Sequence, residues 1–164
     1  MTQRVPCALR SAAPTRPVSG LEDHLGYWLR FASNHVSHAF RLKVEARGVT
    51  VAEWAVMRAM LRAGPLNPSR LAEQLGMTRG AISKLIDRLR NKGLVDRGGK
   101  GKDRRFQRIE LTARGRRLVP ALAQLADENE AEMFGHWPVS TRDELAGMLK
   151  GLVAHHGWKD IPVD

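Results

Sequence analysis

Residues 66–112, LNPSRLAEQLGMTRGAISKLIDRLRNKGLVDRGGKGKDRRFQRIELT, carry most of the information about the fold of this chain. Their pattern predicts two short helices joined by a tight turn, then a β-hairpin whose loop is rich in Lys and Arg. A helix that follows such a turn fits the major groove of DNA, and a basic loop after it can reach a neighbouring groove. The stretch therefore favours a protein that binds duplex DNA.

The two short helices are bounded by local chemistry. Asn67 is the expected N-cap of the first, Pro68 its first residue and Gly76 its terminator. The second helix is expected to begin after the N-cap Thr78 and to end at Gly93. Its inward face is predicted to hold Ile82, Leu85, Ile86 and Leu89. With so short a connection the helices must cross steeply, as in a helix-turn-helix.

The hairpin is predicted from two short runs on either side of the basic loop. The first run covers residues 94–97 and the second covers residues 106–111, which alternate so that Ile109 and Leu111 face the core. Three glycines between residues 98 and 101 favour an irregular loop.

Four further helices are expected. The first runs from Leu21 to Glu45. The next follows a capping box of Thr50 and Glu53 and faces inward through Trp54, Met57 and Leu61. A helix over residues 113–135 follows Thr112, and a last one follows Ser140 and ends at Gly157, with an apolar face of Leu145, Met148, Leu149, Leu152 and Val153.

The predicted fold class is therefore mainly α with a small β-hairpin wing, a winged helix-turn-helix with long N- and C-terminal dimerisation helices. We expect residues 1–20 to form a disordered arm, 49–112 the DNA-binding domain and 158–164 a tail. Residues 21–48 and 113–157 would form the dimerisation region, because their apolar stripes need partners and two copies would bury them.

Charge is unevenly spread along the chain. The net charge is +10 over 164 residues. Residues 79–108 hold eleven basic residues against three acidic ones, whereas residues 119–164 hold three basic residues against eight acidic ones. A basic middle beside an acidic end indicates that a polyanion docks on one region only.

Other classes of protein are disfavoured by composition. No apolar run approaches the roughly 18 residues of a membrane span, and the N-terminal stretch lacks the apolar core of a secretory signal. A single cysteine, Cys7, permits no intrachain disulfide, which fits a reducing cytoplasm. No phosphate-binding glycine loop, zinc spacing or nucleophile elbow is present, so we expect neither an enzyme nor a cofactor.

The candidate DNA-binding residues of the second short helix lie on its outward side near its N-terminus, where inserted helices read base edges. They are Thr78, Arg79, Gly80, Ser83, Lys84 and Arg88. Gly80 lets DNA come close, Arg79 and Lys84 can reach phosphate or guanine, and Arg88 is better placed for the backbone. The alternative is an ordinary solvated helix face.

The hairpin loop supplies a second set of candidates. Lys100, Lys102, Arg104 and Arg105 are expected to contact DNA from a wing in the minor groove, whose narrow shape concentrates negative potential. Asp103 is expected to pair with an adjacent arginine and orient it. A loop that is merely solvated is the alternative.

Residues 71–115 resemble the MarR family of winged-helix transcription regulators. The family's "GLV-x-R" strand entry, "D-R-R" wing and "I-x-LT-x-x-G" exit match residues 93–97, 103–105 and 109–115. The resemblance implies a homodimer built from the terminal helices that binds a pseudo-palindromic operator, usually as a repressor released by a small molecule. It also implies that Arg105 enters the minor groove and that residues 78–84 begin the recognition helix.

An effector site is suggested by the same resemblance, since family effectors often bind near the first two helices. The candidate lining residues are Tyr27, Trp28, His35, His38, Trp54 and Arg58, which suit an aromatic or phenolic anion. Core packing of Trp28 and Trp54 is the simpler interpretation, and we favour it. Peroxide-sensing relatives carry a cysteine at the start of the first helix, where this chain has Gly26, so thiol sensing through Cys7 is not expected.

Metal sensing is also not expected. His35 and His38, and the pair His155 and His156, lack further ligands at a recognisable spacing. The main rival to a sequence-specific regulator is a non-specific or architectural nucleic-acid-binding protein that uses the same basic face. An enzyme or small-molecule carrier with an incidental fold is a second rival.

Overall fold

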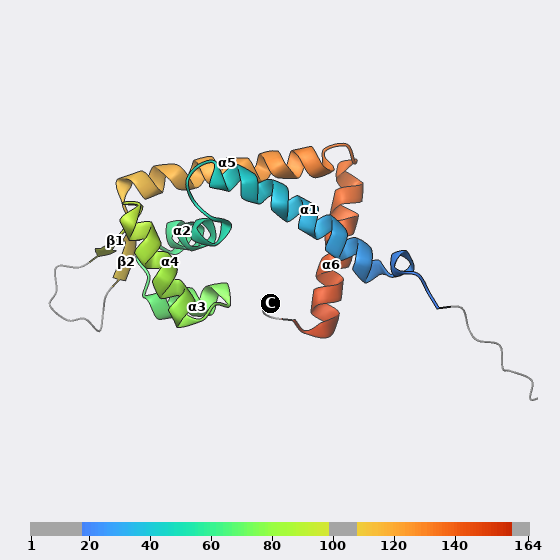
Figure 1. The fold of residues 1–164 in the computed structure, drawn as a ribbon, viewed down its shortest axis with the longest axis horizontal. Coiled ribbons are helices and arrows are strands. Elements are labelled where there is room, and N and C mark those ends of the chain that lie inside the picture. The colour runs from blue at the N-terminus through green and yellow to red at the C-terminus, as the bar shows by residue number, and fades with distance from the viewer. Residues whose placement is uncertain (1–17, 99–107, 159–164) are drawn as a thin grey trace, which may run out of the picture. The chain divides into compact units, whose positions relative to one another are not determined.

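The computed structural model describes residues 18–98 and 108–158. Within these residues a short 3-10 helix (Leu21–Asp23) precedes six α-helices and one antiparallel hairpin (Figure 1). The elements are α1 (Leu25–Glu45), α2 (Val51–Ala63), α3 (Pro68–Leu75), α4 (Arg79–Asn91), β1 (Val95–Gly98), β2 (Arg108–Leu111), α5 (Ala113–Phe134) and α6 (Val139–His156). The predicted fold class, a mainly α winged helix-turn-helix, is confirmed.

The backbone divides into two units, residues 1–34 and residues 35–164. In the described part of the first unit, α1 begins at Leu25, so the predicted start at Leu21 is wrong. A separate turn precedes it, in which the Asp23 carboxylate accepts a hydrogen bond from the Gly20 amide at 2.8 Å and His24 is extended. Trp28 is half exposed, which does not fit the core packing that we favoured for it.

The capping box at the start of α2 is confirmed. The Thr50 hydroxyl accepts from the Glu53 amide at 3.2 Å, and the Glu53 carboxylate accepts from the Thr50 amide at 2.7 Å. Met57 is buried, as predicted, but the rest of the buried face consists of Glu53, Val56 and Met60. Trp54 and Leu61 are only partly buried. Helix α2 has two neighbouring apolar stripes, so the spacing of its apolar residues does not show which stripe is buried.

The helix-turn-helix forms as its caps predict. The Asn67 side chain accepts from the Ser69 amide at 2.8 Å, and Thr78 accepts from the Ala81 amide at 3.2 Å. Gly76 lies between the helices at φ +62°, the left-handed region that other residues rarely adopt. The four predicted inward residues of α4, Ile82, Leu85, Ile86 and Leu89, are all buried.

The hairpin packs beside α4, and its second strand is hydrogen-bonded to the backbone on both sides, to β1 and to Leu66. Val95 pairs with Leu111 and Gly98 with Arg108, while Ile109 on its other side exchanges two hydrogen bonds with Leu66, at 2.8 and 3.1 Å. Ile109 and Leu111 are buried, as predicted. The first strand begins one residue later than expected, and residues 106–107 of the predicted second strand lie outside the described residues.

Thr112 caps α5, as predicted, by accepting a hydrogen bond from the Gly115 amide at 3.1 Å. Gly115 passes so close to the hairpin that a Cβ there would lie 2.1 Å from the Leu94 carbonyl oxygen. Helix α6 follows Pro138 and begins at Val139, so the predicted cap at Ser140 is wrong. Its terminator Gly157 is confirmed.

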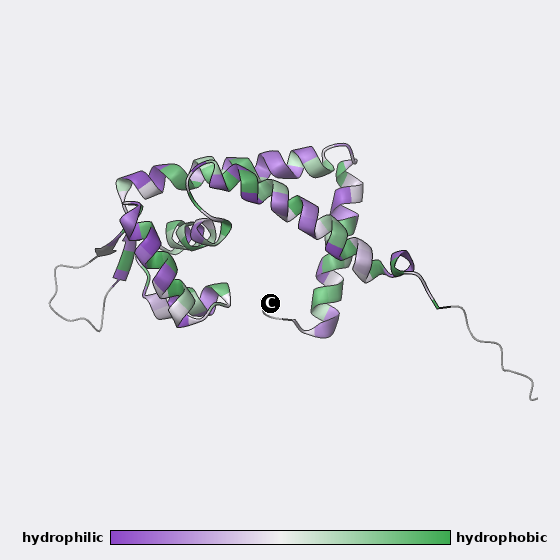
Figure 2. Cartoon of the chain, in the orientation of Figure 1, coloured by the Kyte–Doolittle hydropathy of each residue, from purple (hydrophilic) through white to green (hydrophobic). Residues whose placement is uncertain are grey.

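The hydrophobic core lies in the second unit. It joins buried residues of α2, α3, α4, the hairpin and α5 with Val44 at the end of α1. By contrast, α6 has no buried residue and exposes an apolar stripe, which Figure 2 shows as green segments along the helix. The core therefore supports the helix-turn-helix and leaves α6 with an uncovered apolar surface. None of the helices in the described ranges is long and apolar enough to span a bilayer.

Candidate nucleic-acid interface

Helix α4 presents one polar face to solvent and one apolar face to the core. All six predicted DNA-binding residues in this region are exposed: Thr78, Arg79, Gly80, Ser83, Lys84 and Arg88. They lie opposite the four buried aliphatic side chains, because a helical repeat of 3.6 residues separates the two sets. The outer face of α4 is thus a continuous polar surface that begins at the N-terminus of the helix.

The first turn of α4 is open to a large partner. Nothing lies within 4 Å of the Cβ position of Gly80, so packing within the protein does not require glycine there. The Thr78 oxygen accepts the Ala81 amide, and its hydroxyl hydrogen stays free to donate to a phosphate or a base. This turn can therefore approach a nucleic-acid surface closely.

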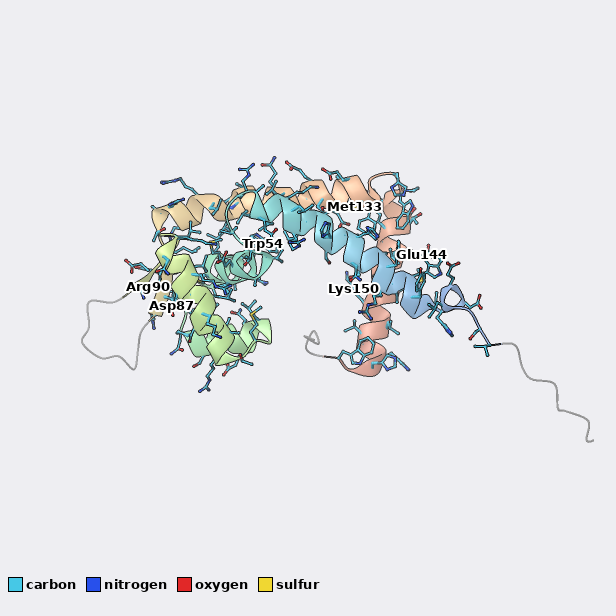
Figure 3. The ribbon with its side chains drawn as sticks, in the orientation of Figure 1. Trp54, Asp87, Arg90, Met133, Glu144 and Lys150 are labelled. Atoms are coloured by element: carbon cyan, nitrogen blue, oxygen red, sulfur yellow. The ribbon has the colours of Figure 1, made fainter. Side chains whose placement is uncertain are left out.

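Three cations on this face are unneutralised. Among the described residues, no carboxylate lies within 4 Å of Arg79, Lys84 or Arg88. Asp87 and Arg90 form a loose ion pair at 3.8 Å, and both project from the outer side of α4 (Figure 3). Because the pair carries no net charge, it leaves the positive potential of the face in place.

The far end of α4 is tied to the rest of the unit. Lys92, the C-cap residue, donates to the Glu53 carboxylate at 2.7 Å, although Glu53 is only 1% exposed. The Thr112 hydroxyl donates to the Gly93 carbonyl at 2.9 Å, and Arg114 donates to the Lys92 carbonyl at 3.3 Å. These contacts connect α4 to α2 and α5, so the exposed face is held on a rigid support.

The predicted wing residues, Lys100, Lys102, Asp103, Arg104 and Arg105, lie outside the described residues. The base of the hairpin is described, since Ile109 is buried and paired on both sides. Gly98 and Arg108, the last described residues of the two strands, pair with each other, and β1 packs against α4.

The predicted effector residues are only partly brought together. Trp54 and Arg58 line a depression of about 580 Å³ between α2 and α3. His38 instead lies beside Arg41, with 3.1 Å between Nδ1 and Nη2, and His35 does not line this depression. Tyr27 and Trp28 belong to the other unit, where their rings pack edge to face at 5.1 Å.

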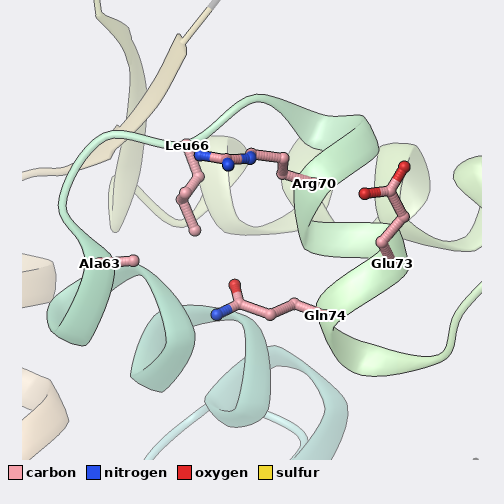
Figure 4. Close-up of a pocket in the computed structure, with 5 residues that line it drawn as sticks. All are labelled: Ala63, Leu66, Arg70, Glu73 and Gln74. Atoms are coloured by element: carbon pink, nitrogen blue, oxygen red, sulfur yellow. The ribbon is translucent and has the colours of Figure 1, made fainter.

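Other residues of this depression escaped the sequence analysis. They are Ala55, Ala59, Leu61, Arg62, Gln74 and Leu75. Arg62 could have been predicted from the sequence, because a spacing of four residues places it on the same side of α2 as Trp54 and Arg58. Gln74 and Leu75 could not have been predicted in this way, since they belong to the next helix, α3. A neighbouring pocket of about 430 Å³ is lined by Ala63, Leu66, Arg70, Glu73 and Gln74 (Figure 4).

No cluster of three or more His, Cys, Asp or Glu side chains that could hold a metal occurs in residues 18–98 and 108–158. The exposed side chains of α4 are cations and hydroxyls, the groups that commonly contact phosphate in nucleic-acid complexes.

Comparison with known proteins identifies this arrangement. The family model described as MarR family matches residues 47–105, which include α2, the helix-turn-helix and β1. The transcriptional regulator HosA of Escherichia coli O157:H7 is 29% identical over 71% of this chain and 86% of its own length. The chain belongs to the MarR family.

Solved structures agree with this assignment. CouR from Rhodococcus jostii RHA1, bound to p-coumaroyl-CoA, superposes with a TM-score of 0.68 at 25% identity, over 82% of this chain and 95% of CouR. The MepR–DNA complex of Staphylococcus aureus superposes with a TM-score of 0.69 over 80% of this chain and 98% of MepR. At 22% identity, the second likeness shows the MarR fold alone.

Membership of the MarR family gives the coarse function. MarR-family proteins are winged-helix transcription regulators that bind DNA, and they are not enzymes. This protein is accordingly a DNA-binding transcription regulator, and the exposed face of α4 is its candidate reading surface.

Proposed function

We propose that the protein acts as a homodimer that represses transcription by binding a pseudo-palindromic operator, and that a small aromatic anion releases it. The observation that carries the DNA-binding part is the outer face of α4, where Arg79, Lys84 and Arg88 are exposed and have no carboxylate within 4 Å among the described residues.

The N-terminal turns of α4 are assigned to base reading. A recognition helix enters the major groove with its N-terminal residues first, so Arg79, Gly80 and Ser83 meet the base edges. Lys84 and Arg88 neutralise phosphates on either side. The loop residues Lys100, Lys102, Arg104 and Arg105 are assigned to the neighbouring minor groove, with Asp103 orienting one of the arginines.

Dimerisation is supported by the uncovered apolar stripe of α6. Met148, Leu149, Leu152 and Val153 are between 40% and 61% exposed. Exposed apolar groups in a repeating row are costly in water, and a second copy would cover them in a twofold interface. Two recognition helices then bind half-sites about one helical turn, roughly 10 base pairs, apart.

The effector is assigned to the depression between α2 and α3. Trp54 supplies an apolar wall and a buried indole N–H that has no partner among the described residues, while Arg58 and Arg62 supply positive charge. CouR is bound to an aromatic acyl-CoA, which supports an aromatic ligand in this fold. Because Leu75 ends α3 just before the turn into α4, a ligand beside it can shift the recognition helix.

The test of the DNA-reading assignment uses Arg79→Ala and Arg88→Ala on a panel of duplexes with single base-pair changes. Arg79→Ala should flatten the sequence preference at one position of each half-site, with a loss of about 1–3 kcal/mol on the preferred base. Arg88→Ala should weaken all duplexes alike and reduce the salt dependence. A uniform loss for both variants favours the rival, a non-specific binder.

The effector assignment is tested with 4-hydroxybenzoate as the probe, by calorimetry and by release from operator DNA. Arg58→Gln should weaken probe binding about tenfold, as expected for a charged hydrogen bond, and leave operator affinity without the probe unchanged. Lys150→Gln, on the exposed surface of α6, is the control. Equal probe binding by both variants would remove the assignment.

A further inference from the structure

We propose that the chain has a second anion site, in which Arg47, Arg114 and Arg117 bind the phosphate group of a small phosphorylated ligand. These arginines line an open depression of about 290 Å³, together with Leu118 and Ala121. We call it the three-arginine depression. It lies between the turn that follows α1 and the first turns of α5, and it shares no residue with the DNA-reading face or the effector depression.

Its position separates it from DNA. Arg114 donates to the Lys92 carbonyl at 3.3 Å, which places the depression at the C-terminal end of α4. The predicted base-reading residues lie at the other end of this helix of 13 residues, roughly 20 Å away at 1.5 Å per residue. A duplex in contact with Thr78 and Arg79 would therefore leave the depression open.

Charge is unbalanced in the depression. Among the described residues, no carboxylate lies within 4 Å of Arg47, Arg114 or Arg117. Glu53 lies close to this end of α4, but its carboxylate already accepts hydrogen bonds from Lys92 and the Thr50 amide. Three guanidinium groups around one concavity repel one another and concentrate positive potential there, and an anion relieves both effects.

Arg114 and Arg117 also lie at the end of a helix that is unfavourable for cations. The first turn of α5 contains no acidic residue, whereas residues 114, 116 and 117 are all arginine. The N-terminus of a helix carries partial positive charge, so cations there are disfavoured and anions are stabilised. Residues that are locally unfavourable for the fold, such as cations at a helix N-terminus, are expected where a protein binds a ligand.

The shape and chemistry of the depression select a phosphate ester or a pyrophosphate. Guanidinium groups pair with phosphate oxygens through two parallel hydrogen bonds, which a halide cannot match. The volume is close to the lower limit of small-molecule pockets, roughly 300 Å³, so a large cofactor does not fit within it. Leu118, which is partly buried, gives the depression an apolar wall against which an organic group can pack.

The experiment measures binding of inorganic pyrophosphate and of phenyl phosphate to the full chain by calorimetry at constant ionic strength. The double variant Arg47→Gln/Arg117→Gln leaves the Arg114 contact to α4 intact. It should bind both probes at least tenfold more weakly than the unaltered protein. The control Arg30→Gln/Lys150→Gln removes two exposed charges elsewhere and should bind them normally. Tighter binding of phenyl phosphate than of inorganic pyrophosphate would assign the site to an organic ester.

Two results would overturn the proposal. One is equal probe binding by the double variant and the unaltered protein. The other is a loss of DNA affinity in the double variant with a shallower salt dependence, which would make these arginines contacts of the DNA backbone. A protein that binds pyrophosphate at this site but binds no DNA would contradict the proposed function and leave this site standing.

Discussion

Two glycines show how single residues divide between fold and function. Gly115 is required by packing, because a Cβ would lie 2.1 Å from the Leu94 carbonyl oxygen. Gly80 has nothing within 4 Å of its Cβ position, although it lies inside α4, where glycine weakens a helix. A glycine that packing does not need, on the exposed side of α4, fits the close approach of DNA that we propose for this helix.

Substitution by alanine is expected to have opposite effects on stability at these two glycines. Gly115→Ala should destabilise the protein by roughly 3 kcal/mol, because it overpacks a site against backbone. Gly80→Ala should raise the free energy of unfolding by up to about 1 kcal/mol through helix propensity, yet weaken operator binding. Thermal melts and fluorescence anisotropy with a labelled duplex measure the two effects. If Gly80→Ala bound DNA normally, Gly80 would have no role in the interface.

The wing assignment is also tested at a single residue. Arg105→Ala should weaken operator binding at least tenfold without lowering the melting temperature, because the side chain is assigned to the minor groove and not to the core. Asp103→Ala should cause a smaller loss if Asp103 orients that arginine. The control is Lys150→Gln on α6. Unchanged affinity of Arg105→Ala would count against a wing contact.

Among the elements, an ion pair between one buried and one partly exposed residue joins α4 to α2. Glu53 both caps α2 and accepts a hydrogen bond from Lys92 at the end of α4, and the two residues differ in exposure, 1% against 37% for their side chains. Removal of the cation would therefore leave a buried carboxylate whose remaining hydrogen bond is the one from the Thr50 amide.

The predicted order of stability follows from this difference in burial. Lys92→Met should cost about 3 kcal/mol and lower the melting temperature by roughly 6–12 °C. The double variant Glu53→Gln/Lys92→Met should recover most of that loss, since the amide can still cap α2 and no charge is stranded. Additive losses in the double-mutant cycle, measured by chemical denaturation, would show that the pair is not coupled.

These elements also show what the sequence could predict. The caps Asn67, Thr78 and Thr112 were predictable because each acts within three residues of itself. The ion pair was not, because Glu53 and Lys92 are 39 positions apart and each alone resembles a surface charge. The buried face of α2 was predicted only in part, because the elements that pack against α2 determine which of its two apolar stripes is buried. Of the six predicted effector residues only Trp54 and Arg58 line the proposed depression, and Gln74 and Leu75 were not predictable because they come from another helix.

In the molecule as a whole, binding of a pseudo-palindromic operator, as we propose, requires two copies of the chain. The hydrophobic core of residues 35–164 includes buried side chains of the helix-turn-helix, whereas α6 contributes no buried residue. Large exposed apolar residues at positions 148, 149, 152 and 153 repeat with helical spacing and need a partner surface.

Charges placed in this stripe should separate the copies. Leu149→Glu/Val153→Glu is expected to change the mass in solution from twice 18.3 kDa to 18.3 kDa and to weaken operator binding at least a hundredfold, because two half-sites no longer bind together. The control Ser140→Glu/Thr141→Glu adds the same charge at the N-terminus of α6, where anions are tolerated. Dimers of unchanged stability in the first variant would exclude α6 from the interface.

The assignment of α4 as the reading helix is tested most directly by a hydroxyl-radical footprint of the full chain on its own promoter DNA. We expect two protected patches related by twofold symmetry, with centres about 10 base pairs apart, and their loss in Arg79→Ala/Lys84→Ala. Even protection along the duplex, or an unchanged footprint in that variant, would contradict the assignment of α4 as the reading helix.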